Sequence, residues 1–299
     1  MKYTIAIPTY NNEKTIQASV ESALSQVGGF EYEVLVVNNM STDSTLQKLQ
    51  NLQKKYDFRL VDNEKHVSLF ENHNVCLMEA NTKYVLFCHS DDVLYDDALI
   101  KIDASLNKYN YPQKIVCWGR SLFKDFYSNY SKVARLNTII SGFFVQELFQ
   151  NGGLTPSGTC YSRESFLKSG GFLHMKDRIT PSDMTSMIKY SLDGGEFLMI
   201  DRILFERTFA STAANISEEQ KFNSYQDAMG ELLKVTDAKV MEMLFFNTRK
   251  FSICNIFYVS SLSKFSKNRK KINYIKLKIL VKQFRDLKSK FIISLLLKM

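Results

Sequence analysis

Two adjacent carboxylates, Asp91 and Asp92, are the side chains of this sequence whose spacing most directly suggests chemistry. They follow a short apolar run, Tyr84 to Cys88, which has the pattern of a buried parallel strand. Neighbouring carboxylates repel each other unless a cation or a hydrogen-bond donor neutralises them. The pair therefore fits a divalent metal that holds a polyphosphate, and it equally fits an Asx turn that caps the next helix.

The segments that must position these acids alternate between apolar strands and amphipathic helices. This alternation predicts an α/β fold, a doubly wound and mostly parallel sheet flanked by helices and joined by right-handed crossovers. Ligands bind such sheets at the carboxyl ends of the strands, where Asp91 and Asp92 fall. Strands are expected at Thr4–Pro8, with Pro8 ending the first, Glu33–Asn39, Phe58–Asp62 and Tyr84–Cys88. A first helix is expected from about Ile16. A second follows an N-cap at Ser41 or Thr42, with Asp43 in its first turn. Two more are expected over Leu69–Ala80 and Asp96–Asn107.

The segments after Asn107 are less regular, and Arg120–Ser157 is only weakly patterned. We expect this stretch to cover one side of a cleft and to set specificity. The further elements that the pattern predicts are strands at Lys114–Gly119 and Thr159–Ser162, a short helix before Gly170, a helix entered through Ser182, and one or two strands in Glu196–Phe209.

Composition bounds the class of protein. The chain has 299 residues, 45% of them apolar, which is enough for a sizeable core in one large or two modest domains. Its five cysteines are widely spaced and form no CxxC pair, which suits buried roles in a reducing compartment. The first residues, MKYTIAIPTY, are too short for a signal-peptide core, so we expect a cytoplasmic protein.

Positive charge is concentrated at the end of the chain. The net charge is +8, but residues 264–299 carry twelve Lys or Arg against one acid, so the remaining residues sum to −3. This distribution argues against a broad nucleic-acid-binding surface on the main body.

Residues 272–299 have apolar side chains at helical spacing, interleaved with lysines. A basic amphipathic helix of this kind is typical of a segment that lies on an anionic membrane surface. The alternative is a helical pair that packs on the main domain or on a second subunit. No apolar run reaches the roughly 18–20 residues that span a bilayer, so we expect peripheral attachment.

Four segments, taken together, carry a family resemblance. In order they are IPTYNNEKTI, VVNNMSTDST, KYVLFCHSDDVL, and SRESFLKSGGF followed by PSDMTSMIKYSL. They resemble family 2 of the glycosyltransferases, inverting enzymes with the GT-A fold, over about residues 3–207. The resemblance implies a catalytic domain at 1–210, with a nucleotide-sugar-binding half at 1–110 and an acceptor-side half at 111–210. Residues 211–299 would form a helical region with the basic tail.

The resemblance also implies roles for residues at three strand ends. Pro8, Thr9 and Tyr10 would contact the nucleotide base, and Asn38 and Asn39 would lie beside a uracil. The family usually has Asp-Asp where this chain has Asn38-Asn39. An amide still pairs with a uracil or thymine edge because it both donates and accepts.

Asp91 and Asp92 would bind the donor through a metal. By the same matching, Asp91 contacts the ribose and the metal, and Asp92 ligates the metal, for which Mn²⁺ or Mg²⁺ is suited. The metal would neutralise the departing diphosphate. Asp183, at the start of a later helix, would be the general base, or else an ordinary first-turn acid.

Several positions depart from the family pattern or carry weaker assignments. His89 replaces the first acid of the usual run, and would touch a phosphate or the metal, support another ligand, or lie on the acceptor side. His73 stands where the family has Arg, beside the diphosphate or on the helix surface. Arg207 matches an Arg near the active site. Lys176 and Arg178 would meet a diphosphate or an anionic acceptor, unless they are solvated loop charges.

These observations predict a metal-dependent inverting glycosyltransferase. The donor would be a UDP- or dTDP-sugar, and the acceptor a lipid-linked glycan of a capsule or lipopolysaccharide at the inner face of the cell membrane. A nucleotidyltransferase would share the sheet and the acids, but the sequence lacks the glycine-rich basic loop that such chemistry favours. A catalytically silent membrane-associated partner is the other alternative.

Overall fold

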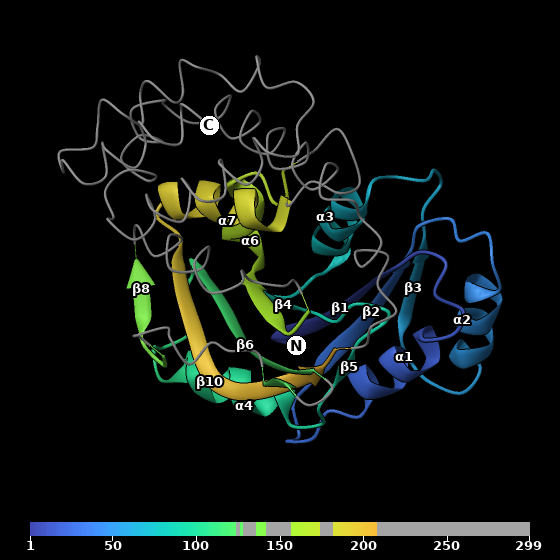
Figure 1. Cartoon of the computed structure of the whole chain (residues 1–299), viewed down its shortest axis with the longest axis horizontal. Coiled ribbons are helices and arrows are strands. Elements are labelled where there is room, and N and C mark those ends of the chain that lie inside the picture. Colours follow the sequence, from blue (N-terminus) through green and yellow to red (C-terminus); the bar gives the residue numbers. More distant parts are fainter. Residues whose placement is uncertain (124–125, 128–135, 142–156, 174–181, 208–299) are drawn as a thin grey trace, which may run out of the picture. The chain divides into compact units, whose positions relative to one another are not determined.

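The structure is a computed structural model that describes residues 1–123, 126–127, 136–141, 157–173 and 182–207 (Figure 1). All of them lie within one contact unit, Met1–Asn215. The predicted helical region at 211–299, with its basic tail, lies outside the described residues, and the predicted domain division stays a prediction. In the part of the chain that is described, no helix is both long and apolar enough to cross a bilayer.

Strands and helices alternate from β1 to β4, as predicted. Strand β1 pairs in parallel with both β2 and β4, and β2 pairs in parallel with β3. The elements are β1 (Tyr3–Thr9), α1 (Ile16–Leu24), β2 (Tyr32–Asn38), α2 (Thr45–Gln53), β3 (Arg59–Asp62), α3 (Leu69–Glu79) and β4 (Tyr84–Phe87).

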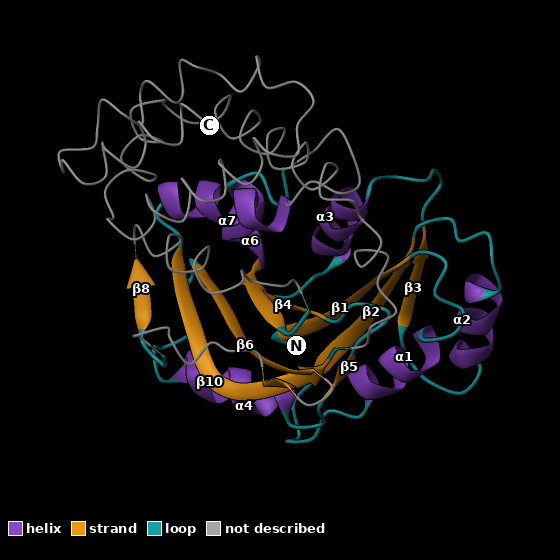
Figure 2. Ribbon diagram, in the orientation of Figure 1, coloured by secondary structure: helices purple, strands orange, loops and turns teal. Residues whose placement is uncertain are grey.

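The second half completes one sheet, whose path runs β3-β2-β1-β4-β9-β6-β10-β5 (Figure 2). Strand β9 is antiparallel to both β4 and β6, whereas β10 is parallel to β6. The elements are β5 (Val93–Leu94), α4 (Ala98–Asn107), β6 (Ile115–Phe123), β7 (Phe126–Tyr127), β8 (Ile139–Ser141), β9 (Thr159–Ser162), α6 (Arg163–Lys168), α7 (Ser182–Leu192) and β10 (Glu196–Glu206). The predicted α/β class is confirmed; the antiparallel β9 and the short β5, β7 and β8 were not predicted.

Helices cover both faces of the sheet, with α1, α2 and α4 on one side and α3, α6 and α7 on the other (Figures 1 and 2). Alternation along β4 explains how one strand serves both layers. Tyr84, Leu86 and Cys88 belong to the apolar cluster with α1 and α4. Phe87 points to the opposite face, where its ring meets Phe172 at 5.8 Å. That face is built mainly from aromatic rings.

The prediction that Pro8 ends the first strand is wrong, because β1 continues to Thr9 and Pro8 pairs with Val37. Successive residues of β1 direct their backbone groups alternately to the two neighbouring strands, β2 and β4. Ala6 is directed toward β4, because its carbonyl oxygen accepts from the backbone N–H of Cys88, directly after that strand. Pro8 faces that same side, but the pairing with β4 has ended at Phe87. A missing N–H therefore costs no ladder bond at this position.

The predicted start of the second helix is also wrong. The N-cap of α2 is Ser44, three residues after Ser41, so Asp43 precedes the first turn. Ser41 Oγ instead donates to Asn38 Oδ1 at 2.6 Å, and the backbone N–H of Thr42 donates to Asn11 Oδ1 at 2.8 Å. Both candidate caps are thus used to fasten the loop between β2 and α2.

We expect the capping box of α3 to matter for stability. Ser68 Oγ accepts from the backbone N–H of Glu71 while the Glu71 carboxylate accepts from the backbone N–H of Ser68. Ser68→Ala removes this reciprocal pair and should lower the free energy of unfolding by about 1 kcal/mol in urea denaturation. Ser44→Ala is the matched control, because Ser44 caps α2 without a side-chain bond. Equal losses for the two variants would contradict the prediction.

Candidate functional site

The acidic turn, residues His89–Asp92, follows β4 and brings together three groups that bind metals. One ring nitrogen of His89 and one carboxylate oxygen each of Asp91 and Asp92 lie within 4.8 Å of one another. Asp92 is 4% exposed, whereas His89 and Asp91 are half-buried. Burial raises the pKa of Asp91, and a backbone N–H and the charge of Arg207 oppose part of that rise. Two carboxylates and one imidazole form a donor set that suits a divalent cation.

Hydrogen bonds from three parts of the chain fix the acidic turn. The backbone N–H of Asp92 donates to His89 O at 3.0 Å, and Ser19 Oγ in α1 donates to Asp92 O at 2.7 Å. The backbone N–H of His89 donates to Ser157 Oγ at 3.0 Å. The alternative interpretation, in which the acids cap the next helix, is wrong, because the N-cap of α4 is Asp97. The acids are instead presented at the sheet edge.

The loop after β1 is joined to the acidic turn. Thr9 is buried, and its Oγ1 donates to Asn12 Oδ1 at 3.3 Å. The same Asn12 oxygen accepts from Ser90 Oγ at 2.7 Å. The predicted base-contacting loop and the predicted metal turn are therefore neighbours in space.

Tyr10, another predicted base contact, is exposed at the end of this loop. Its side chain is 36% exposed, and its ring centroid lies 4.4 Å from that of His66. His66 Nδ1 lies 3.0 Å from Asn39 O. His66 was not predicted, since no motif surrounds it between β3 and α3. The two exposed rings form a surface on which a planar base can stack.

Asn38 occupies the carboxyl end of β2 and is fully buried. Its Nδ2 donates to Asp62 Oδ1 at 2.6 Å, and its Oδ1 accepts from Ser41 Oγ at 2.6 Å. Asp62 itself is exposed. A carboxylate at position 38 could not donate to Asp62, which explains the amide at this position.

Asn39 also uses both ends of its amide. Nδ2 donates to Val67 O at 2.8 Å, and Oδ1 accepts from Val67 N–H at 2.9 Å and from Asn63 Nδ2 at 3.1 Å. Asn63 Nδ2 also donates to Asn72 Oδ1 at 2.9 Å. This amide network ties the ends of β2 and β3 to α3.

His73 has a different place from either prediction made for it. It is fully buried in α3 rather than on the helix surface, and burial lowers its pKa to about 3. Its Nδ1 lies 2.8 Å from Leu69 O, and its Nε2 lies 3.0 Å from His89 Nε2. Both ring nitrogens are therefore used within the protein, and this arrangement leaves neither for a diphosphate.

Arg207 lies close enough to the acidic turn to act on two of its residues. Burial and the charge of Arg207 lower the pKa of His89 to about 4, and the same charge opposes part of the rise that burial causes in the pKa of Asp91. Its backbone N–H donates to Leu122 O at 2.9 Å, which continues the pairing between β10 and β6. The role beside the active site that the family resemblance implies for Arg207 stays a prediction.

The predicted general base begins a helix, as expected: α7 starts at Ser182, so Asp183 is its second residue. Its side chain lies outside what the structure describes, as do Lys176 and Arg178 entirely. Their roles stay predictions.

Helices α3 and α7 are joined through the residues after β9. Asn74 Nδ2 donates to Phe172 O at 2.7 Å, and Asn74 Oδ1 accepts from the backbone N–H of Phe172 at 2.8 Å. The backbone N–H of Leu173 then donates to Ser186 Oγ in α7 at 2.8 Å. This α3–α7 link connects the helix that carries His73 to the helix that begins at Ser182.

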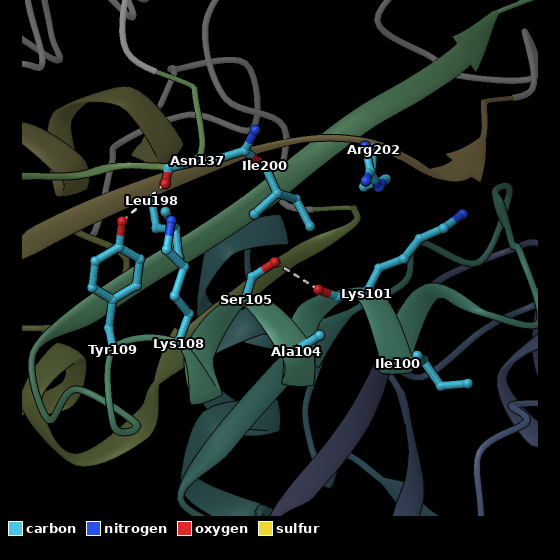
Figure 3. A pocket seen from close by; sticks show the side chains of 10 residues that line it. All are labelled: Ile100, Lys101, Ala104, Ser105, Lys108, Tyr109, Asn137, Leu198, Ile200 and Arg202. Carbon is cyan, nitrogen blue, oxygen red and sulfur yellow. Dashed lines mark hydrogen bonds between the residues drawn. The ribbon is translucent and has the colours of Figure 1, made fainter.

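A groove of about 330 Å³ lies between α4 and β10 (Figure 3). Its wall carries the cations Lys101, Lys108 and Arg202 around apolar residues such as Ile200. It shares no lining residue with the acidic turn. Its cations are partly engaged, since Lys101 pairs with Asp97 at 2.6 Å.

Comparison with known proteins decides the family. The family model described as glycosyl transferase family 2 matches residues 4–169, more than half of the chain. The chain belongs to glycosyltransferase family 2. The match spans β1 to α6 and so includes the acidic turn, while the helix of Asp183 lies beyond it.

Two curated relatives of this family 2 chain align over shorter stretches. An uncharacterised protein of Mycobacterium tuberculosis is 27% identical over 181 residues, which are 56% of each chain. The poly(ribitol-phosphate) beta-N-acetylglucosaminyltransferase TarS of Staphylococcus aureus is 32% identical over 112 residues, 37% of this chain and 20% of the relative. The chain therefore spans about half or less of the curated relatives that it matches.

A solved structure confirms the GT-A fold. The S. aureus TarS 1-349 structure in complex with UDP-GlcNAc superposes with a TM-score of 0.62 at 18% identity, covering 95% of this chain and 79% of that one. At this identity the likeness shows the fold alone.

We expect Asn38→Asp to destabilise this family 2 domain, because it places a second carboxylate 2.6 Å from Asp62 Oδ1 in a buried position. Losing the donor and adding like-charge repulsion should lower the free energy of unfolding by about 1–3 kcal/mol at neutral pH. Chemical denaturation measures this.

The exchange variant Asn38→Asp with Asp62→Asn is the control, because it restores one donor and one acceptor in reversed order. It should recover at least half of the lost stability. Additive losses in the double variant would show that the two side chains do not depend on each other.

Proposed function

We propose that this chain is a metal-dependent, inverting glycosyltransferase that moves a sugar from a nucleoside diphosphate to a hydroxyl group of a surface glycan. The observation that carries the proposal is the acidic turn, in which His89, Asp91 and Asp92 converge at the carboxyl edge of β4. Edges of this kind are where open α/β sheets bind ligands. Membership of family 2 supports the class of reaction.

The acidic turn would hold a divalent cation, Mn²⁺ or Mg²⁺. Asp91 and Asp92 would supply hard oxygen ligands, and Asp91 would also contact the donor ribose. The bound cation would neutralise the negative charge that develops on the leaving diphosphate. The hydrogen bonds to the backbone of the turn would hold it in position before the donor arrives.

A UDP- or dTDP-sugar is the favoured donor. Tyr10 and His66 offer a stacking surface, and Asn38 holds the exposed carboxylate of Asp62 at the same edge. A carboxylate accepts from the N3–H that uracil and thymine share. The TarS structure with UDP-GlcNAc, in a protein of the same fold, supports the uridine donor.

Asp183 would act as general base at the first turn of α7. It would take the proton of the acceptor hydroxyl while that oxygen attacks the anomeric carbon opposite the leaving diphosphate. One displacement of this kind inverts the configuration of the sugar. Arg207 would add positive charge beside the diphosphate.

The acceptor would be a polymer or lipid-linked glycan at the inner face of the cell membrane. Relatives named as poly(ribitol-phosphate) glycosyltransferases support a cell-surface polymer. The basic residues 264–299 would bind anionic lipids, and Lys176 and Arg178 would meet an anionic acceptor. The acceptor glycan would be, for example, part of a capsule or of lipopolysaccharide.

We expect calorimetric titration to show that UDP binds in the presence of Mn²⁺ and at least tenfold more weakly without it. GDP and CMP should bind more weakly than UDP or dTDP. Asp92→Asn should remove the effect of Mn²⁺, since it takes one charge from the ligand set. Asp96→Asn is a matched control, an exposed acid four residues further along the chain.

Each alternative gives a different outcome in that titration. If none of the four nucleotides binds with or without Mn²⁺, the silent-partner hypothesis replaces the enzyme. If both Asp variants behave alike, the acidic turn is not the metal site.

We expect Asp183→Asn to lower kcat by about 10²–10⁴-fold while UDP binding with Mn²⁺ stays within twofold, because only proton removal from the acceptor is lost. Donor transfer to a cell-wall polymer fraction measures kcat, and NMR of the product gives the anomeric configuration. Glu164→Gln is the control, an exposed acid paired with Lys168. A retained configuration, or full activity of Asp183→Asn, would overturn this assignment.

A further inference from the structure

The contact between His73 and His89 determines which nitrogen of His89 carries a proton. Their Nε2 atoms lie 3.0 Å apart, so one must donate and the other must accept. The other ring nitrogen of His73, Nδ1, determines which of the two Nε2 atoms donates. It lies 2.8 Å from the carbonyl oxygen of Leu69, which only accepts.

The position of the ring hydrogen on His73 then determines its position on His89. His73 must carry its hydrogen on Nδ1 to bond Leu69 O, so its Nε2 has a lone pair in the neutral ring. That lone pair accepts from His89, which must carry its hydrogen on Nε2. A neutral His89 therefore has its lone pair on Nδ1.

The surroundings of His73 keep its ring neutral and in place. It has no exposed surface, and the ring centroids of Phe87 and Phe172 both lie 5.2 Å from its own. A third ring, Phe70, lies at 5.5 Å. Such an apolar enclosure disfavours the imidazolium form and leaves few alternative rotamers.

The strand pattern explains why these two histidines meet. Side chains two residues apart face the same side of an extended strand, and Phe87 of β4 faces the aromatic layer with α3. His89 follows two residues later and meets His73 on that side. Its neighbours Asp91 and Asp92 turn at the sheet edge.

We propose that His73 is a positioning residue that fixes the tautomer of His89, so that His89 binds the divalent cation through Nδ1 together with Asp91 and Asp92. This inference rests on the proposed function and names the atom through which His89 would bind the cation. A histidine that ligates a metal commonly donates its other N–H to a partner, which here is a second histidine.

The mixed ligand set has a consequence for metal choice. Imidazole nitrogen suits Mn²⁺ better than Mg²⁺, which prefers an all-oxygen environment. We therefore expect the chain to bind Mn²⁺ more tightly than Mg²⁺, and His89→Asp to reduce that preference at least tenfold. His89→Asn removes the imidazole ligand, and should therefore bind Mn²⁺ more weakly than the wild-type chain does.

The decisive test is pulsed electron paramagnetic resonance of Mn²⁺ bound to the full chain, alone and with UDP, using histidine labelled with ¹⁵N at Nδ1 or at Nε2. We expect directly bound nitrogen, replaced by ¹⁵N only in the Nδ1-labelled protein and absent in His89→Asn. In the metal-free protein, long-range ¹H–¹⁵N NMR should show the hydrogen on Nδ1 of His73 and on Nε2 of His89.

Two substitutions at position 73 separate positioning from packing. His73→Phe fills the aromatic enclosure without an acceptor, and should weaken Mn²⁺ binding about 10-fold or more. His73→Gln keeps an acceptor near the position of Nε2 and should recover binding to within threefold of wild type. The same spectra recorded on both variants show whether the Nδ1 coupling follows the affinity.

Other outcomes overturn the inference separately from the proposed function. Mn²⁺ that binds with UDP but shows no histidine nitrogen, or shows Nε2, overturns it and leaves the transferase proposal standing. Absence of binding by Mn²⁺, alone or with UDP, overturns both. If His73→Phe does not fold, the labelled wild-type spectra still decide.

Discussion

The pairing of β1 with both β2 and β4 is the constraint on which the site depends. Parallel pairing places the carboxyl ends of all three strands at one edge, although they are far apart in the sequence. Strand pairing therefore brings Thr9, Asn38 and the acidic turn to the same edge of the sheet. Single hydrogen bonds, such as that from Ser90 to Asn12, then refine an arrangement that the sheet has already made.

The edge differs chemically on its two sides. On the side of β2 and β3, amides bond to one another and to backbone groups, so few carboxylates have to be buried there. On the side of β4, two carboxylates stand together with Arg207 as a nearby positive charge. Negative charge is thus concentrated at the acidic turn, where a cation can bind. On the other side, the amide of Asn39 bonds only to neutral groups, and Asp62 is the carboxylate that accepts from Asn38.

Much of the fold could be predicted from the sequence because apolar periodicity determines where strands and helices lie. The helix that contains Leu69 and the strand that ends at Phe87 are examples. The direction of strand pairing and the positions of helix N-caps were harder to predict from the sequence. The residues of β9 have no pattern that distinguishes antiparallel from parallel pairing, and Ser41 looks like a cap because its bond to Asn38 is invisible in sequence.

The candidate site divides in the same way. Asp91, Asp92 and Tyr10 could be found because their positions follow from strand ends and motif order. His66 could not, since a lone histidine between β3 and α3 has no signal of its own. The burial of His73 depends on aromatic residues such as Phe172 that come from distant segments, which no local pattern of α3 contains.

The α3–α7 link joins two helices that are far apart in the sequence by hydrogen bonds through Phe172 and Leu173. Asn74 holds Phe172 by both of its backbone groups, and the next residue is bonded to Ser186. Gly171 has a φ of +63°, and a Cβ there would meet Asn74 Oδ1 at 2.5 Å, so the contact demands glycine. A ligand that displaces α3 must either carry α7 with it or break these bonds.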